Sequence, residues 1–294
     1  MELKGTYTAM ITPFKEDVID EEGFRQNIQF QIQAGISGLV FLGTTAEAMT
    51  LTQDEKKRII EIGVEEGKGR VTLIVGTGSN CTKTTLEQTK QAADLGADAA
   101  LVVTPYYIRP NQEGVYKHFQ EVASDSSLPL IIYNIPGRTG ISIEISTLLR
   151  LTEFPSIIGI KESNKSFQKS DEMIRTVRKK APSFSILSGD DLLNFPLIAL
   201  GASGTISVLS NLIPKEMTTF IQTCLEGDSL KARKLHQKFS PLYEILSLDV
   251  NPIPIKEAMR QCGMPTGGYR LPLCQINPEK KKKLEESLME FGLD

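Results

Sequence analysis

Short apolar runs return at regular intervals along the chain, and no other feature of the sequence constrains its fold as tightly. They occupy residues 6–12, 38–42, 71–75, 99–103, 130–133, 157–160, 184–187 and 204–208. Their starting points lie 20 to 33 residues apart, and each run is nearly continuous in Val, Ile, Leu and Ala. A strand exposed on one face would alternate apolar with polar residues, so these runs indicate strands buried on both faces of a parallel sheet.

The segments between the runs carry the periodicity of amphipathic helices. Phe24, Ile28 and Ile32, for example, recur on one helical face. Thr52 and Glu55 have the spacing of a capping box, which predicts a helix start at that point. Strand and helix units in alternation, without a Gly/Ser-rich linker, predict an α/β fold of the closed (β/α)8 barrel type, the TIM barrel. The alternative is a doubly wound open sheet.

The part of the chain after residue 208 contains no further strand-like run of this kind. It contains helical stretches that begin near Pro214, Ser229, Pro254 and Pro278. A barrel of this type needs about 250 residues, so a chain of 294 residues suits one barrel with an addition. We therefore expect the barrel in residues 1–227 and a C-terminal helical extension in residues 228–294.

Composition excludes several classes of function. The formal net charge of −3 provides no basic field for nucleic acid, and no apolar run reaches the roughly 18 residues of a membrane span. The cysteines show no paired spacing and no cleavable apolar segment opens the chain, so we expect a cytoplasmic protein with free thiols.

Metal and cofactor sites are also not expected. The chain has only His118 and His236, and Asp190 and Asp191 lack a third ligand nearby, so we expect that carboxylate pair to complement a helix N-terminus instead. No Gly-x-Gly-x-x-Gly motif follows a strand-like run, so nothing predicts a dinucleotide.

In a barrel of this type, catalytic side chains lie at the C-terminal ends of the strands. Lys161 directly follows the run 157–160, where partial burial favours the neutral amine that attacks carbonyl carbons. Tyr133 closes the neighbouring run, and its phenol suits proton transfer to and from that amine. The alternatives are a lysine that extends to solvent and a core tyrosine with its hydroxyl at the rim.

Two further strand ends carry groups that suit carboxylates. Thr44 and Thr45 follow a glycine in a strand-to-helix turn, where hydroxyl and amide groups near a helix N-terminus can hold an anion. Arg138 lies between Gly137 and Gly140, and a guanidinium in such a loop suits bidentate binding of a second carboxylate. Simple helix capping and a surface salt bridge are the respective alternatives.

Taken together, the strand-end motifs resemble one family. They are Gly43-Thr44-Thr45-x-Glu47, Pro105-Tyr106-Tyr107, Tyr133-Asn134-Ile135-Pro136-x-Arg138-Thr139-Gly140, Gly159-Ile160-Lys161-Glu162, Ser188-Gly189-Asp190-Asp191 and, near the end, Asn251-Pro252-Ile253-Pro254-Ile255-Lys256. In this order, across essentially the whole chain, they resemble the dihydrodipicolinate synthase family of pyruvate-dependent class I aldolases. One departure is Ala46, where the family usually has glycine, and the added methyl group removes no reacting group.

The resemblance implies a lyase that condenses pyruvate with L-aspartate 4-semialdehyde to give 4-hydroxy-tetrahydrodipicolinate, in diaminopimelate and lysine biosynthesis. By position, Lys161 is similar to the family's Schiff-base lysine and Tyr133 to its general acid/base. Thr44 would link Tyr133 to Tyr107 in a proton relay, with Tyr107 crossing a dimer interface to complete the partner's site. The resemblance implies no cofactor.

Substrate binding and assembly also follow from the resemblance. Thr45 would hold the pyruvate carboxylate with its hydroxyl and backbone amide, and Arg138 would bind the carboxylate of the semialdehyde. Gly189 and Ile206 match backbone positions that line the family's site. The resemblance implies a homotetramer built as a dimer of dimers.

The alternative function is a sister lyase, such as N-acetylneuraminate lyase or a keto-deoxy sugar-acid aldolase, which shares the lysine and the paired threonines. Arg138 favours the synthase, because a polyhydroxy chain needs no cation there. Tyr106-Tyr107 followed by Arg109-Pro110 also resembles the synthase. A barrel that only senses a keto acid is a third interpretation, and the shortage of histidines argues against a metal-dependent class II aldolase.

We expect feedback inhibition by L-lysine to be weak or absent. Family members that respond to lysine bind it in a dimer-interface pocket, and this chain keeps Asn80 and Tyr106 of that pocket. It has Thr84 where those members place a glutamate for the ligand's ammonium group, and Gln53 and Lys56 where they place histidines. A partly buried ammonium group without an anionic partner binds poorly.

Overall fold

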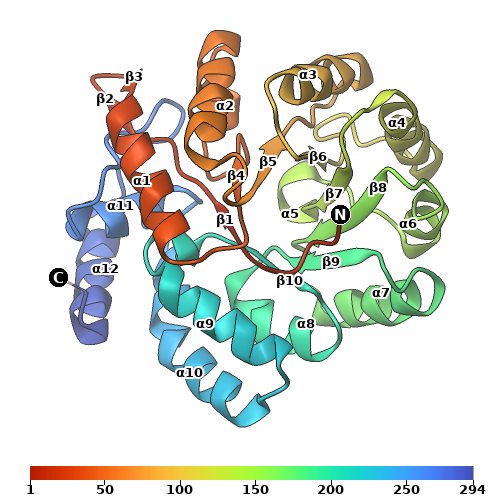
Figure 1. Cartoon of the computed structure of the whole chain (residues 1–294). Coiled ribbons are helices and arrows are strands. Elements are labelled where there is room, and N and C mark those ends of the chain that lie inside the picture. The colour runs from red at the N-terminus through yellow and green to blue at the C-terminus, as the bar shows by residue number, and fades with distance from the viewer. Residues whose placement is uncertain (294) are drawn as a thin grey trace.

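Parallel strands close into a barrel in the computed structural model, which describes residues 1–293 (Figure 1). Around the barrel the order is β1-β10-β9-β8-β7-β6-β5-β4. The strands are β1 (Gly5–Ala9), β4 (Gly38–Phe41), β5 (Thr72–Gly76), β6 (Ala99–Val103), β7 (Leu130–Asn134), β8 (Ile157–Glu162), β9 (Ser185–Ser188) and β10 (Gly204–Ser207). Each of them overlaps one predicted run, so the (β/α)8 barrel is confirmed and the open sheet is wrong.

Helices surround the barrel and cover its strands (Figure 1). They are α1 (Glu21–Gln33), α2 (Gln53–Gly67), α3 (Thr82–Asp94), α4 (Gln112–Asp125), the short α5 (Pro136–Thr139), α6 (Ile145–Leu151), α7 (Phe167–Lys180), α8 (Asn194–Ala199) and α9 (Pro214–Leu225). The predicted capping box opens α2: the Thr52 hydroxyl accepts from the Glu55 N–H, and the Glu55 carboxylate accepts from the Thr52 N–H. This reciprocal pair explains why the helix starts there.

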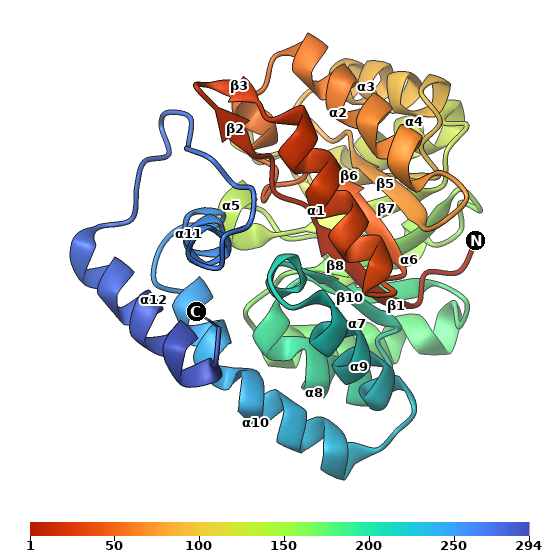
Figure 2. The ribbon, with the colours of Figure 1, turned by 60° about the vertical axis from the view of Figure 1, so that its left-hand side comes forward.

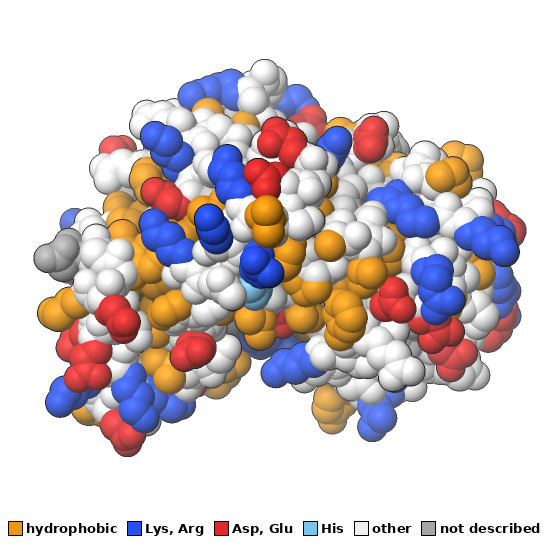
Figure 3. Space-filling view, turned by 90° about the horizontal axis from the view of Figure 1, so that it is seen from below, with side chains coloured by type: hydrophobic (Ala, Val, Ile, Leu, Met, Phe, Trp, Pro, Cys, Tyr) orange, Lys and Arg blue, Asp and Glu red, His pale blue; other side chains and the backbone are white. Residues whose placement is uncertain are grey.

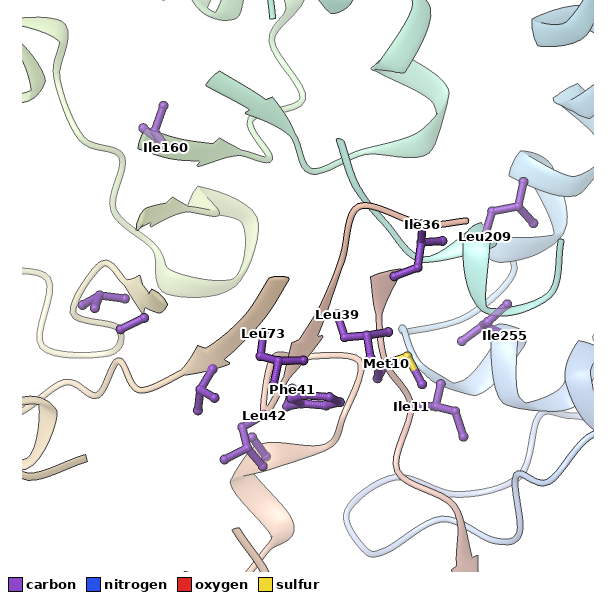
Figure 4. Packing of buried hydrophobic residues seen from close by; sticks show 14 of the residues in the cluster. Met10, Ile11, Ile36, Leu39, Phe41, Leu42, Leu73, Ile160, Leu209 and Ile255 are labelled. Atoms are coloured by element: carbon purple, nitrogen blue, oxygen red, sulfur yellow. The ribbon is translucent and has the colours of Figure 1, made fainter. Parts of the chain in front are cut away.

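Buried side chains form two layers, one inside the barrel and one between the strands and the helices. Along β4, Leu39 and Phe41 belong to the outer layer, whereas Val40 belongs to the inner one. Figure 4 shows Leu39 and Phe41 packed beside Leu73 of the next strand. Neighbouring residues of a strand therefore face opposite sides of the barrel wall, as the pleat requires.

The periodicity does not predict the small antiparallel hairpin formed by β2 (Phe14–Lys15) and β3 (Val18–Ile19). Strands of two residues are too short to show a pattern. Phe14 also forms a bridge with Gly267, whose φ is 63°. A side chain at Gly267 would overlap the Phe14 backbone, so only glycine fits. The hairpin thus contacts the C-terminal part of the chain.

Three helices follow the barrel, namely α10 (Ser229–Leu246), α11 (Ile253–Gln261) and α12 (Pro278–Phe291). Together with α9, they begin at or within one residue of the predicted positions. Helix α10 packs against α8 and α9, and α12 packs against α10 and α11 (Figure 2). The division of the chain at residue 227 into a barrel and an extension stays a prediction.

Charged side chains of both signs lie among one another on the face seen in Figure 3. This distribution accords with the formal net charge of −3. Within residues 1–293, no helix is both long and apolar enough to cross a lipid bilayer.

Candidate active site

Lys161 and Tyr133 lie side by side on the inner wall of the barrel. Their Cα atoms are paired across β8 and β7, and the Lys161 Nζ lies 4.4 Å from the centre of the Tyr133 ring. Both side chains are buried. Lys161 lies inside β8 and not after it as predicted, because the strand continues to Glu162. A buried amine that touches a phenol ring is placed to react with a small carbonyl compound.

Gly189 directly follows β9, and Ile206 lies in β10, the next strand around the barrel. A Cβ at Gly189 would lie 2.9 Å from the Lys161 Cε and closer still to the Ser163 hydroxyl, so a larger residue would displace the lysine. The Gly189 N–H donates to the Glu162 carbonyl over 2.8 Å. Ile206 is fully buried in the same inner layer as Tyr133. Gly189 therefore adjoins the lysine directly, and Ile206 belongs to the barrel interior.

A cavity of about 660 Å³ opens at the C-terminal ends of the strands. Its wall brings together Thr44 from the turn after β4, Tyr107 from the loop after β6, and Tyr133 and Arg138 from β7 and the helix α5 that follows it. Tyr133 both lines the cavity and contacts Lys161. The volume is in the range of small-molecule sites, so the cavity can hold two small keto or aldehyde acids.

The turn after β4 carries Thr44 and Thr45. Thr45 is buried, and its hydroxyl accepts a hydrogen bond of 3.0 Å from the Asn251 side-chain amide. Because this oxygen accepts from Asn251, its own proton is free for an anion. A short 3-10 helix (Ala48–Thr50) follows the turn, and α2 begins at Gln53, where the capping box predicted it, so the two threonines do not lie at an α-helix N-terminus as expected. A carboxylate would meet hydroxyl and backbone N–H groups here, without the dipole of a long helix.

Arg138 lies in α5 and contacts a distant part of the chain. Its Nη2 donates to the Asn251 carbonyl over 3.0 Å. Asn251 thus touches both predicted carboxylate-binding residues, Thr45 through its side chain and Arg138 through its backbone. The sequence placed Asn251 only within a family motif. Its separation of 113 residues from Arg138 and 206 from Thr45 hides this role from any local pattern.

Glu47 and Lys256 form a buried ion pair beside the same turn. Their charged atoms are 2.7 Å apart and both side chains are inaccessible to solvent. The Lys256 ammonium group also donates to the carbonyls of Thr12 and Gly268. Burial lowers the pKa of Lys256, and the Glu47 carboxylate opposes this effect. Ala46 is buried in this turn, and its carbonyl accepts from the Thr12 hydroxyl. The sequence analysis named Lys256 only within a family motif and gave it no role, although a lysine after a row of apolar residues is a usable signal.

Tyr107 projects from the loop after β6. Its side chain is 87% exposed and its φ is 71°. It shares the cavity wall with Thr44 and Tyr133, but no hydrogen bond joins these three hydroxyl groups in the part of the chain that the structure describes. The proton relay therefore stays a prediction.

The tandem carboxylates after β9 both accept hydrogen bonds from backbone N–H groups, and those that Asp191 accepts come from 17 and 18 residues further along the chain. Asp190 accepts from the N–H of Leu192 at the start of a 3-10 helix (Asp191–Leu193), and Asp191 accepts from the N–H groups of Val208 and Leu209. Among residues 1–293, no three His, Cys, Asp or Glu side chains are grouped as metal ligands.

Comparisons with known proteins agree with this geometry. The sequence model of the dihydrodipicolinate synthetase family matches residues 2–291. The 4-hydroxy-tetrahydrodipicolinate synthase of Protochlamydia amoebophila is 47% identical over 292 residues, which cover 99% of this chain and 97% of that protein.

Solved structures of the family also match nearly the whole chain. Dihydrodipicolinate synthase from Thermotoga maritima has a TM-score of 0.98 and 36% identity, with each chain covered completely. The chloride-inhibited dihydrodipicolinate synthase from Acinetobacter baumannii, complexed with pyruvate, has a TM-score of 0.95 and 37% identity over 99% of each chain. Since the family model spans nearly the whole chain and the fold matches throughout, this chain belongs to the dihydrodipicolinate synthetase family.

Proposed function

We propose that this chain is a lyase that condenses pyruvate with L-aspartate 4-semialdehyde to 4-hydroxy-tetrahydrodipicolinate, in diaminopimelate and lysine biosynthesis, through a Schiff base on Lys161. The observation that carries the proposal is the buried Lys161 amine, 4.4 Å from the Tyr133 ring, behind a cavity that also presents Arg138. Relatives that are 41 to 47% identical over nearly the whole chain carry the name 4-hydroxy-tetrahydrodipicolinate synthase, which supports it.

The reaction begins when the neutral Lys161 amine attacks the keto carbon of pyruvate. The carbinolamine loses water to form the Schiff base, and loss of a methyl proton gives an enamine, whose carbon attacks the aldehyde of the semialdehyde. The amino group of the semialdehyde then attacks the imine carbon, which closes the ring and releases the Lys161 amine. Tyr133 donates and accepts the protons of these steps, because its ring adjoins the amine. Thr44, on the cavity wall, links Tyr133 to the partner subunit's Tyr107, and this relay passes protons between Tyr133 and solvent.

The two substrates are held by their carboxylates. The Thr45 hydroxyl donates a hydrogen bond to the pyruvate carboxylate, since its oxygen already accepts one from Asn251. Arg138 binds the carboxylate of the semialdehyde at the cavity wall. Gly189 leaves room for the lysine, and with the Ile206 backbone it borders the pyruvate.

A sugar-acid aldolase is the less favoured function. Its substrate presents hydroxyl groups along a chain, whereas this cavity places a guanidinium on its wall. The named relatives support the synthase as well. A barrel that only senses a keto acid would not need Tyr133 beside the amine.

Assembly and location belong to the same proposal. The chain forms a homotetramer, a dimer of dimers, in which the exposed Tyr107 of each subunit enters its partner's site. The enzyme acts in the cytoplasm.

Borohydride trapping tests the proposal. Pyruvate with sodium borohydride should add one stable mass increment to Lys161 of the wild type and none to the Lys161→Ala variant. A coupled assay should show turnover with aspartate semialdehyde and none with pyruvate plus N-acetylmannosamine. Full labelling of Lys161→Ala would refute the covalent role, and preference for the sugar substrate would replace the synthase by a sugar-acid aldolase.

A further inference from the structure

A carboxylate and an amide lie directly beside the reacting pair, on the opposite side of the barrel wall. Asn134 follows Tyr133, and Glu162 follows Lys161. The β7–β8 register pairs Tyr133 with Lys161 and Asn134 with Glu162. The Asn134 Nδ2 donates to both Glu162 carboxylate oxygens, over 3.1 and 2.9 Å. Strand alternation places Lys161 and Tyr133 inside the barrel and this pair outside.

The Asn134–Glu162 pair also binds the loops that leave the two strands. The Glu162 carboxylate accepts from the Asn164 N–H over 2.6 Å. The Asn134 Oδ1 accepts from the Ile143 N–H over 3.1 Å, at the end of the loop that begins with α5. The pair therefore connects β7, β8 and both following loops through one set of hydrogen bonds.

Stability alone does not explain a carboxyl group at this position. Asn134 and Glu162 are 1% and 4% exposed, and the hydrogen-bond partners of the carboxyl are uncharged. Burial raises the pKa of Glu162 to about 7 in spite of these partners. Keeping a charge out of water without a cation is unfavourable, whereas an apolar pair of similar volume would avoid that cost.

We propose that Asn134 and Glu162 are positioning residues that hold the ends of β7 and β8 in register, so that the Lys161 amine stays against the Tyr133 ring. The inference rests on the proposed roles of Lys161 and Tyr133. Each positioning residue adjoins one reacting residue in the chain, so a slip between the two strand ends moves the amine relative to the phenol. A displacement of about 1 Å between reacting groups can lower a rate roughly 100-fold.

Single substitutions break the pair in opposite ways. In Glu162→Gln, the new amide nitrogen faces the Asn134 nitrogen, so two donors oppose each other, because the Asn134 oxygen is used by Ile143. In Asn134→Asp, two carboxylates oppose each other. Each variant should lower kcat at least about tenfold, because the amine and the phenol are no longer aligned.

Exchanging the two groups should restore the function. The double variant Glu162→Gln with Asn134→Asp again faces an amide with a carboxylate. The new amide oxygen can accept from Asn164 and the new carboxylate from Ile143. We expect its kcat within about threefold of the wild type, a double-mutant coupling that a merely destabilising change does not produce.

A matched control removes a carboxylate at the other end of the barrel. Asp98 joins β5 and Lys68, accepting from the Leu73 N–H over 2.9 Å and from the Lys68 ammonium group. Catalysis uses the C-terminal face and not this one. Asp98→Asn should therefore lower the melting temperature without changing kcat by more than about twofold.

The outcomes separate clearly. Single variants with kcat within about threefold of the wild type, or a folded exchange variant no more active than they are, overturn the positioning role. If the single variants do not fold, the exchange variant decides alone by the same threshold. Failure of the wild type to label with pyruvate and borohydride refutes the proposed function instead, and this is measured without any substitution at Asn134 or Glu162.

Discussion

At the scale of single residues, the contact between Lys161 and Tyr133 follows from their places on two short neighbouring strands. Residues paired across parallel strands point to the same side of the sheet, so both side chains enter the barrel. Gly189 completes the arrangement, because any Cβ there would press on the lysine. The amine and phenol proposed to react are therefore positioned by backbone geometry, and single atoms removed from these side chains should change rates more than folding.

Tyr133→Phe should keep the ring beside Lys161 and remove only the hydroxyl. Loss of one positioned acid/base group should lower kcat by roughly 10²–10⁴-fold, while borohydride trapping of pyruvate continues at a slower rate. A coupled assay measures kcat, and mass spectrometry of the trapped protein measures the rate of labelling. A variant within about threefold of the wild type would assign the proton transfers to another group.

Arg138→Ala should weaken the binding of the semialdehyde more than the binding of pyruvate. A lost charge-assisted hydrogen bond costs about 1.5–3 kcal/mol, so KM for the semialdehyde should rise roughly 10- to 150-fold. The matched change Arg138→Lys keeps the charge but loses the bidentate geometry of the guanidinium. Its KM for the semialdehyde should lie between those of the wild type and of Arg138→Ala. Equal increases of KM for both substrates would make the guanidinium a structural group that only binds the Asn251 carbonyl.

L-Lysine should inhibit weakly or not at all. Gln53 and Lys56 line a small cavity of about 30 Å³, and none of its lining residues within the described chain is a carboxylate. Burial lowers the pKa of Lys56. The carboxylate of Glu47, which could otherwise supply an anion, is already paired with Lys256. A lysine titration at sub-saturating pyruvate that gives half-inhibition below about 1 mM, an affinity near −4 kcal/mol, would contradict this.

At the scale of elements, the turn after β4 and the helix α11 hold each other in place. The Lys256 ammonium group donates to Glu47 and to two backbone carbonyls, and Asn251 donates to Thr45 just before α11 begins. The turn that carries the predicted relay residue Thr44 and the predicted carboxylate-binding residue Thr45 is thus fixed by a helix from the far end of the chain. We expect the Glu47–Lys256 pair to fix the conformation of this turn, in addition to neutralising a buried charge.

Lys256→Met should therefore damage both stability and turnover. Removing one partner of a buried ion pair leaves an uncompensated charge and costs about 3–5 kcal/mol of unfolding free energy. Urea denaturation measures this loss. The double variant Lys256→Met with Glu47→Gln removes the orphaned charge and should regain much of it. A single variant within about 1 kcal/mol of the wild type would show that solvent reaches Glu47 after all.

At the scale of the whole molecule, the barrel gathers strand ends from the whole ring at one mouth, and the segment after α10 borders it. The cavity wall includes Asn251, Pro252, Pro272 and Leu273 as well as strand-end residues. Near the same mouth, Tyr107 is 87% exposed, and Ile108 and Leu271 are also largely exposed. An aromatic side chain that lines a site yet faces solvent fits an arrangement in which a second subunit covers it.

Sedimentation at assay concentration should show an assembled species of at least two 32.5 kDa chains, with the proposed tetramer as the full assembly. An isologous contact requires each subunit to give and receive the same residue. Mixing inactive Tyr107→Phe and Lys161→Ala chains should then restore part of the activity, because one site of a mixed dimer regains both groups. A fully active monomer would rule out this sharing.

The sequence alone determined the barrel and the position of its chemistry. Strand burial, helical faces and the Thr52 capping box are local properties, so all eight barrel strands and the C-terminal helices could be predicted. The proximity of Lys161 and Tyr133 could be predicted as well, because the ends of neighbouring barrel strands meet at the same mouth, whereas their catalytic roles stay a proposal. The two-residue strands of the hairpin could not be predicted, because so few residues show no periodicity.

Only the tertiary structure decided which distant groups meet at the site. Asn251 lies 206 residues from Thr45, and Lys256 lies 209 residues from Glu47, yet each pair is in hydrogen-bond contact. The Asn134–Glu162 bonds likewise depend on the register of β7 with β8. A local pattern tells which side of a strand or helix is buried, but the partner of a buried polar group depends on how the whole chain closes.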